Sequence, residues 1–379
     1  MLFRISYACA AMYFFVQAIF VAFAFACVVK TLAELKAPRW LLVGTVLFYA
    51  LMPYHIMFSI GHSKDVLFSV SITLFSITLF HLLQDSNVRK REYAFLFMES
   101  VGFCMMRNNG ILAFAFFIPV FFFSFRNKKR IILILLLSAM LCVFIKRPML
   151  RLLDIPQSDL FESLSLPTQQ IARTVIDHND LTPDEFGVLN PIMDVSLIPQ
   201  TYNPGLSDPI KRLIRSTTHE NPISTRQKLD FAKLWVQLGL RHPITYAKAF
   251  VDLTCGYWNS GYEAAPWCNF IYKNNLGLHL TNPVPLLTML FDRYIGAFDD
   301  FSILQLTICT GLFVWAYLIS LFICLTRRDK VGAILCVPVL CVLQTLLLGV
   351  PVACDLRYIY CAFCGLPFTL AFSTRPQSG

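Results

Sequence analysis

The chain has 379 residues, of which 56% are hydrophobic and only 15% are charged. A soluble domain usually carries about 25% charged residues, and it could not cover this much apolar surface with polar groups. The composition therefore excludes an ordinary soluble protein and is typical of a chain that lies in a lipid bilayer. The net charge of +9 does not indicate nucleic acid, because most of the excess basic residues lie in short segments between apolar runs.

Apolar runs bounded by charge, Pro or Gly predict about nine transmembrane helices. They lie at 6–29, 40–59, 66–83, 93–106, 111–125, 131–145, 303–325, 331–348 and 358–372. Several runs are shorter than the ~20 residues that a full crossing needs, and the pair at 93–125 is alternatively a re-entrant hairpin. The expected fold class is an all-α polytopic membrane protein.

Basic residues predict the topology of these spans. Clusters follow the first, third, fifth and seventh spans, at 30–39, 89–91, 126–130 and 327–330. Alternating crossings place all four clusters on one face, which is the cytoplasm under the positive-inside rule. We therefore expect a multi-pass protein of the cell membrane with a bundle at 1–145, an extracytoplasmic domain at 146–300 and a second bundle at 301–379.

The polar 146–300 region has the pattern of a folded, mainly helical domain. Ser224 and Gln227 form a capping box that opens a helix. That helix has one apolar face, built from Phe231, Leu234, Trp235 and Leu238. His242-Pro243 should break it, and a second helix should run to about Thr254 and end near Gly256.

Two polar groups at the predicted outer ends of spans are candidates for chemistry. Lys64 and Asp65 open the third span, where Lys64 is a candidate phosphate ligand and Asp65 a candidate base or metal ligand. They are alternatively a simple helix start at the headgroup level. Arg107, Asn108 and Asn109 lead into a turn between two spans. An Arg beside an apolar run is costly to desolvate, so anion binding is one hypothesis for this group, and a plain turn is the alternative.

Two further groups of residues each have a functional and a structural interpretation. Asp355, Arg357 and Tyr358 precede the last span, either as ligands of a pyrophosphate or as an interfacial ion pair beside a belt aromatic. Tyr257 and Trp258 follow the domain's second helix, where aromatic rings suit a sugar face or dock a loop on the membrane.

The order of these motifs carries a resemblance that covers nearly all of the chain. The order is Lys64-Asp65, Arg107-Asn108-Asn109-Gly110, Asp208-Pro209, His242-Pro243, Gly256-Tyr257-Trp258 and Arg357-Tyr358. The chain thereby resembles a family of bacterial multi-pass proteins of unknown function that is similar to the GT-C superfamily of glycosyltransferases.

The resemblance implies transfer of a sugar from a polyprenyl-phosphate carrier to an acceptor at the outer face of the membrane. Under that hypothesis the partners are membrane lipid and the lipid-linked sugar, with no nucleic acid. Asp65 would be the catalytic base. The donor phosphate would be bound by Lys64, Arg107 and Arg357, and the substrates by Asn108, Asn109, Tyr257, Trp258, Asp355 and Tyr358. A divalent metal is an open option, although no ligand set for one is visible.

One departure from the superfamily leaves alternatives open. Such enzymes typically have an acidic catalytic residue in a first outer loop, after a first span, and this chain starts at what corresponds to the second span. We expect either that this span and acid are missing from the chain or that the chain is not catalytic. The alternatives are a non-catalytic protein that binds a lipid-linked glycan or a partner, and a lipid-glycan transporter. A transporter would often show internal repeats, which are not visible in the sequence.

The topology generates a direct test. Reporter fusions placed after Asn190 and after Arg328 should report opposite sides of the membrane, because the four basic clusters hold one face in the cytoplasm. Signals from the same side at both positions would refute the proposed topology.

Overall fold

The structure is a computed structural model, and it describes residues 10–61, 63–84, 89–149, 152–153, 164–219, 223–261, 284–349 and 352–374. Within these ranges the regular structure is helical, apart from two isolated β-bridges, which confirms the all-α prediction. The chain divides into two compact units. Unit 1 is formed by 1–154, 263–344 and 356–379, and unit 2 by 155–262 and 345–355. The predicted boundaries at 146 and 300 stay a prediction.

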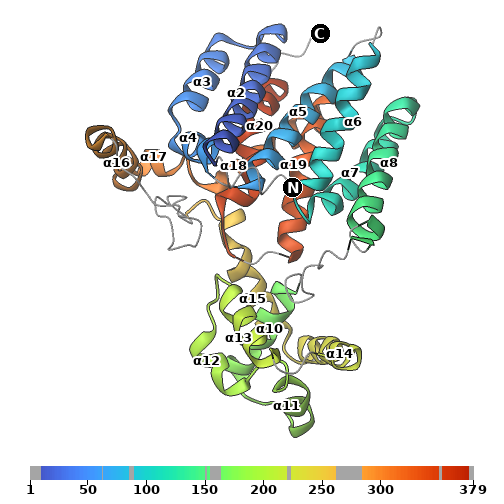
Figure 1. Cartoon of the computed structure of the whole chain (residues 1–379), viewed down its shortest axis with the longest axis vertical. Helices are drawn as coiled ribbons and strands as arrows, with labels where there is room; N and C mark the ends of the chain where they lie inside the picture. The colour runs from blue at the N-terminus through green and yellow to red at the C-terminus, as the bar shows by residue number, and fades with distance from the viewer. Residues whose placement is uncertain are drawn as a thin grey trace. The chain divides into compact units, whose positions relative to one another are not determined.

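Unit 1 is a bundle of apolar helices (Figure 1). Its first part contains α2 (Ala10–Glu34), α3 (Arg39–Leu51), α4 (Pro53–Ile60), α5 (Lys64–Gln84), α6 (Lys90–Met105), α7 (Gly110–Ser124), α8 (Lys129–Phe144) and the π-helix η1 (Ile145–Met149). Its second part contains α16 (Pro285–Asp300), α17 (Ser302–Gln305), α18 (Thr310–Thr326), α19 (Lys330–Gly349), η5 (Leu356–Ile359) and α20 (Tyr360–Thr374). The last residues of α19, from Thr345, belong to unit 2.

Among the described residues, four segments are long and apolar enough to cross a membrane, and a bent pair makes a possible fifth. The four are Met12–Glu34, α5, α19 and Leu356–Thr374, and the pair is α3 with α4, bent by 52°. The predicted runs fall largely on helix, although 40–59 is interrupted at Met52 and 303–325 at 306–309, and residues 6–9 lie outside the described residues. Nine crossings are not confirmed. The reason is length, because α6, α7, α8 and α18 have only 15–17 residues, and a full crossing takes about 20.

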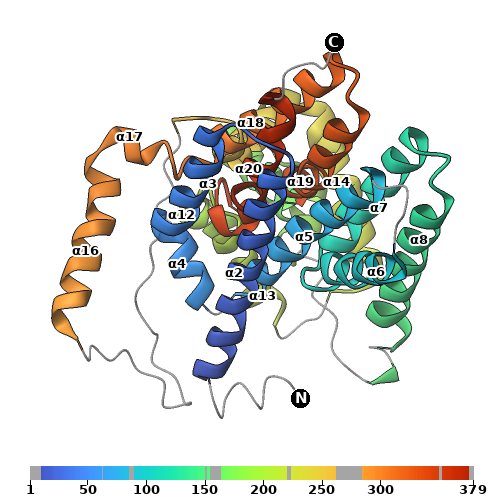
Figure 2. The ribbon, with the colours of Figure 1, turned by 90° about the horizontal axis from the view of Figure 1, so that it is seen from above.

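Helix α5 lies in the interior of unit 1 and packs against α2, α6 and α20 (Figure 2). It is buried on nearly all sides although it carries several hydroxyl groups. Ser69, Thr73 and Ser76 donate those hydroxyls to carbonyls four residues earlier in the same helix, at 2.8–2.9 Å. Each of these three hydroxyls thus has its partner within α5, which lowers the cost of enclosing them among apolar neighbours.

A close contact brings α6 against α5. A Cβ atom at Gly102 would lie 2.6 Å from the Ser71 hydroxyl, so a larger residue here would require the Ser71 side chain to move. Nearby, Glu99 of α6 accepts a hydrogen bond of 3.0 Å from Thr78 of α5. Glu99 therefore has one hydrogen-bonding partner in a neighbouring helix, while its second oxygen, Oε2, is buried without a hydrogen bond among the described residues.

Unit 2 is built from short helices around one apolar core (Figure 1). Its helices are α10 (Ser165–His178), α11 (Pro183–Leu189), η3 (Val195–Leu197), α12 (Ile198–Thr201), α13 (Asp208–Thr218), α14 (Thr225–Arg241), α15 (Pro243–Thr254) and η4 (Cys255–Tyr257). The segment after α19 joins this unit, where Val352 bridges to Leu206 and the amide of Ala353 donates to the carbonyl of Gly205.

The predicted helix pair is confirmed. Ser224 and Gln227 form the capping box that opens α14. Phe231, Leu234 and Leu238 are buried in the core, and Pro243 begins α15. The sequence pattern was sufficient here because the cap, the apolar period and the breaker are all local signals.

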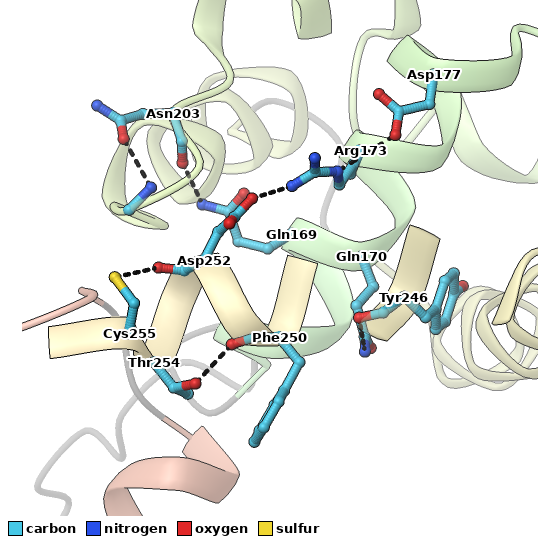
Figure 3. A network of polar contacts seen from close by, with 11 residues as sticks. Gln169, Gln170, Arg173, Asp177, Asn203, Tyr246, Phe250, Asp252, Thr254 and Cys255 are labelled. Atoms are coloured by element: carbon cyan, nitrogen blue, oxygen red, sulfur yellow. Dashed lines mark hydrogen bonds and ion pairs between the residues drawn. The ribbon is translucent and has the colours of Figure 1, made fainter. Parts of the chain in front are cut away.

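A polar network fastens α10 to α15 and to the 203–206 turn (Figure 3). Arg173 lies between Asp177 on its own helix and Asp252 on α15. Gln169 donates its amide to the carbonyls of Asn203 and Leu206, at 3.1 and 2.7 Å. These bonds hold the turn onto α10.

Glu185 generates a stability prediction. Its carboxylate, only 10% exposed, pairs with Arg241 at 2.6 Å and caps the start of α11 through the amide of Thr182. Hydrogen bonding to Arg241 is the main reason that the pKa of Glu185 is lowered. Substitution Glu185→Gln should cost about 1–2 kcal/mol at neutral pH. Because the native pKa is depressed, this contribution is present above the unfolded-state pKa and is lost as pH falls through the native one.

Thermal unfolding of the purified full chain, at neutral pH and in acid, measures the contribution of the Glu185 carboxylate to stability. The wild type and Glu185→Gln should differ at neutral pH and converge in acid. As a control, Arg226→Gln removes only a 93% exposed partner of Asp230 and should change little. A difference between the wild type and Glu185→Gln that persists in acid would contradict the ionic contribution.

Candidate functional site

The candidate site in unit 1 is centred on the carboxylate of Asp65. Asp65 lies in the first turn of α5, where its backbone amide donates to the Ser63 hydroxyl at 3.2 Å. Its side chain is only 8% exposed. A carboxylate removed from water to this extent needs cationic partners.

Two arginines from distant parts of the sequence are those partners. The Nε atom of Arg107 lies 3.1 Å from Oδ1 of Asp65, and the Nε atom of Arg357 lies 3.6 Å from Oδ2. The Arg107 side chain is 11% exposed and that of Arg357 is 44% exposed. One carboxylate therefore joins the loop between α6 and α7 to η5, with the inner arginine largely buried and the outer one partly exposed.

Tyr358 is an aromatic surface for both guanidinium groups. The guanidinium carbons of Arg107 and Arg357 lie 4.4 and 5.0 Å from the centre of its ring. Arg107 also donates from Nη1 to the backbone carbonyl of Tyr358 at 2.8 Å. Cation–π contact and a hydrogen bond thus orient the inner arginine independently of Asp65.

A third cation reaches the site from the end of α8. Lys146, half-buried in η1, donates its Nζ to the backbone carbonyl of Arg107 at 2.8 Å. Lys146 is not among the residues predicted from the sequence. The available signal was its position directly after an apolar run, which is also the position of Arg107. Lys64 is exposed at the start of α5, beside Asp65 in the chain.

The loop that carries Arg107 has little room for side chains at its end. Gly110 opens α7, and a Cβ atom there would lie 2.3 Å from the carbonyl oxygen of Phe103 and 3.0 Å from the ring of Phe68. Asn108 is exposed and Asn109 half-buried in the same loop. The Asn-Asn-Gly sequence therefore makes the tight turn that places Arg107 against α5.

The remaining predicted residues belong to unit 2. Tyr257 is fully buried, whereas Trp258 is 40% exposed and its indole lies 3.3 Å from the Thr254 hydroxyl. Of the two aromatics, only Trp258 presents a ring at the surface, so the expected pair of exposed rings is reduced to one. Asp355 is half-buried.

The arrangement favours an anion. Arg107 and Arg357 converge on a single carboxylate, and Lys146 contacts the backbone carbonyl of Arg107, so the site has an excess of positive charge. Guanidinium groups match the oxygens of a phosphate or carboxylate. In the part of the chain that the structure describes, no three His, Cys, Asp or Glu side chains gather in a way that could hold a metal ion.

The difference in exposure between the two arginines generates a prediction. Substitution Arg107→Ala should destabilise unit 1 by about 3 kcal/mol, because it removes one partner of a buried ion pair together with the bond to Tyr358. Substitution Arg357→Ala should cost about 1 kcal/mol or less, because that pair is partly screened by solvent. Thermal unfolding in one detergent checks this, and an equal or larger loss for Arg357→Ala would contradict the assignment of inner and outer arginine.

Comparison with known proteins identifies a family but no characterised relative. No curated protein and no solved structure matches the chain. A family of unknown function, DUF6020, matches residues 5–377. Since this match spans nearly the whole chain, the protein is a member of the DUF6020 family.

Proposed function

We propose that the protein is a GT-C-like glycosyltransferase that moves a sugar from a polyprenyl-phosphate donor to an acceptor at the outer face of the membrane. The observation that carries the proposal is the convergence of Arg107 and Arg357 on Asp65. These residues come from three segments far apart in the chain. Two guanidinium groups at the ends of apolar helices are suited to a phosphate that is attached to a lipid.

The proposed reaction uses the cations on the leaving group. An acceptor oxygen or nitrogen attacks the anomeric carbon, the bond between that carbon and the phosphate oxygen breaks, and the acceptor proton passes to a base. The leaving polyprenyl phosphate gains negative charge as the bond breaks. Arg107 and Arg357, with Lys146 and Lys64 nearby, would stabilise that charge more strongly in the transition state than in the bound donor.

Asp65 has two possible roles in this proposal. It is the candidate base named from the sequence, and its carboxylate is also the resident counter-ion of both arginines. Both of its oxygens already lie beside guanidinium groups, which supports the counter-ion role. A phosphate that enters the site would take over one or both arginines and release the carboxylate.

The engagement of Asp65 also favours one alternative, a non-catalytic protein that binds a lipid-linked glycan. The same cations would hold the phosphate, and no base would be needed. Binding without turnover distinguishes this alternative from the enzyme.

The proposed topology is multi-pass, with up to nine crossings and with 146–300 outside the cytoplasm. The four candidate spans and the bent pair support the membrane part of this proposal. Helices such as α7 and α18 would then cross a thinned or locally adapted bilayer. The positive-inside arrangement of the basic clusters supports the orientation.

The arginines generate a kinetic prediction. Arg107→Ala and Arg357→Ala should each reduce polyprenyl-phosphate-dependent sugar transfer on the order of 100- to 1000-fold, the loss typical of one electrostatic stabiliser of a transition state. Arg→Lys should restore the rate only in part, because Lys cannot make the two-pronged contact. Arg357→Ala is the cleaner test, since its side chain is more exposed and its loss should disturb folding less.

Asp65→Asn separates the two roles of that residue. If Asp65 is the base, transfer should be lost while donor binding persists. If it is the counter-ion, the variant should bind polyprenyl phosphate more tightly, because no carboxylate competes for the arginines. Full transfer rates in both alanine variants would refute the site, and donor binding that depends on the arginines without any transfer would favour the non-catalytic protein.

A further inference from the structure

Unit 2 has a second apolar surface that its own core does not use. On α14 the exposed large side chains are Leu229, Val236 and Leu240, at 59%, 50% and 80% exposure. On α15 they are Ile244 and Val251, at 71% and 43%. We call these five residues the α14–α15 face. Single exposed apolar residues are ordinary, but five on consecutive helices mark a contact surface.

The spacing of these exposed residues places them along one side of each helix. On α14 the exposed residues are 7 and 4 positions apart, and on α15 they are 7 apart, so each set lies along one side. The opposite side of α14 carries Phe231, Leu234 and Leu238, which lie in the core of unit 2. The opposite side of α15 carries the buried Tyr246, Ala249 and Leu253. Both helices are therefore apolar on two sides, and only one side of each is buried in the structure.

Basic side chains flank this face. Lys233 and Arg226 of α14 are 73% and 93% exposed, and Lys248 lies one turn after Ile244 on α15. Asp230 pairs with both Arg226 and Lys233, at 3.9 and 3.4 Å, and offsets only part of their charge. The result is an apolar stripe bordered by net positive charge.

We propose that the α14–α15 face binds the headgroup region of an anionic lipid bilayer. An amphipathic helix with aliphatic residues on one side and Lys or Arg at the border binds in the plane of such a surface. Charge complementarity selects anionic lipid. Four segments among the described residues are long and apolar enough to cross a membrane, so a lipid bilayer is the partner expected beside this chain. This surface is independent of the Asp65 site and of the proposed transfer.

Chemical labelling of the native lysines tests whether this face binds lipid. The full chain is placed in nanodiscs of phosphatidylcholine with and without phosphatidylglycerol, and an amine-acylating reagent labels exposed lysines, which are quantified by mass spectrometry. Lys228 is the internal control, because it is exposed on α14 about a quarter turn away from the apolar stripe. We expect phosphatidylglycerol to reduce labelling of Lys233 and Lys248 roughly fivefold relative to Lys228.

Substitutions then test whether the apolar side chains of the α14–α15 face are needed for this binding. The double variant Leu240→Gln, Ile244→Gln should lose the protection, and a matched control, Phe186→Gln, Leu197→Gln, should keep it. The control pair is also exposed in unit 2, at 46% and 41%, but lies on other helices. Equal labelling of the three lysines in both lipids would overturn the proposal. Protection that persists in detergent and disappears on dilution would also overturn it and would assign the face to a second copy of the chain.

Discussion

The burial of the Asp65 carboxylate is the constraint on which the geometry of unit 1 depends. A carboxylate at 8% exposure is tolerated only beside cations, and the cations come from the loop after α6 and from η5. Each partner is itself supported, Arg107 by the Tyr358 carbonyl and both arginines by the Tyr358 ring. Because removal of one partner leaves another charge poorly solvated, the position of each of these segments is tied to the others.

Buried polar contacts fix the segments on either side of this ion pair. Gln17, on α2, donates its amide to the carbonyls of Phe58, Ser59 and Gly61, which end α4 just before the turn into α5. His55 of α4 lies 2.7 Å from the hydroxyl of Tyr360, at the start of α20. These contacts hold the chain immediately before Asp65 and immediately after Arg357. The site is thus supported from within the bundle, as a preorganised anion site requires.

Unit 2 is stabilised differently, by the apolar core of a small helical domain. Its polar contacts lie at helix ends and between helices, such as the Glu185–Arg241 pair and the network around Arg173. What distinguishes it from a soluble domain is the apolar α14–α15 face. Two helices that are apolar on both sides are consistent with a domain that works next to lipid, whichever chemistry the Asp65 site performs.

The sequence alone determined the features that depend on local pattern. Composition established the membrane class, apolar runs located the helices, and Ser224, Gln227 and Pro243 marked the ends of α14 and the start of α15. It also selected Asp65, Arg107 and Arg357 as unusual, because charge beside an apolar run is costly. It could not establish the number of crossings, since several helices are shorter than a crossing needs.

Only the tertiary structure decided that Arg357 pairs with Asp65, that Lys146 reaches the carbonyl of Arg107, and that Tyr257 is buried while Trp258 is not. Pairing and burial depend on which helices pack together, and no local pattern in the sequence determines which distant segments come into contact.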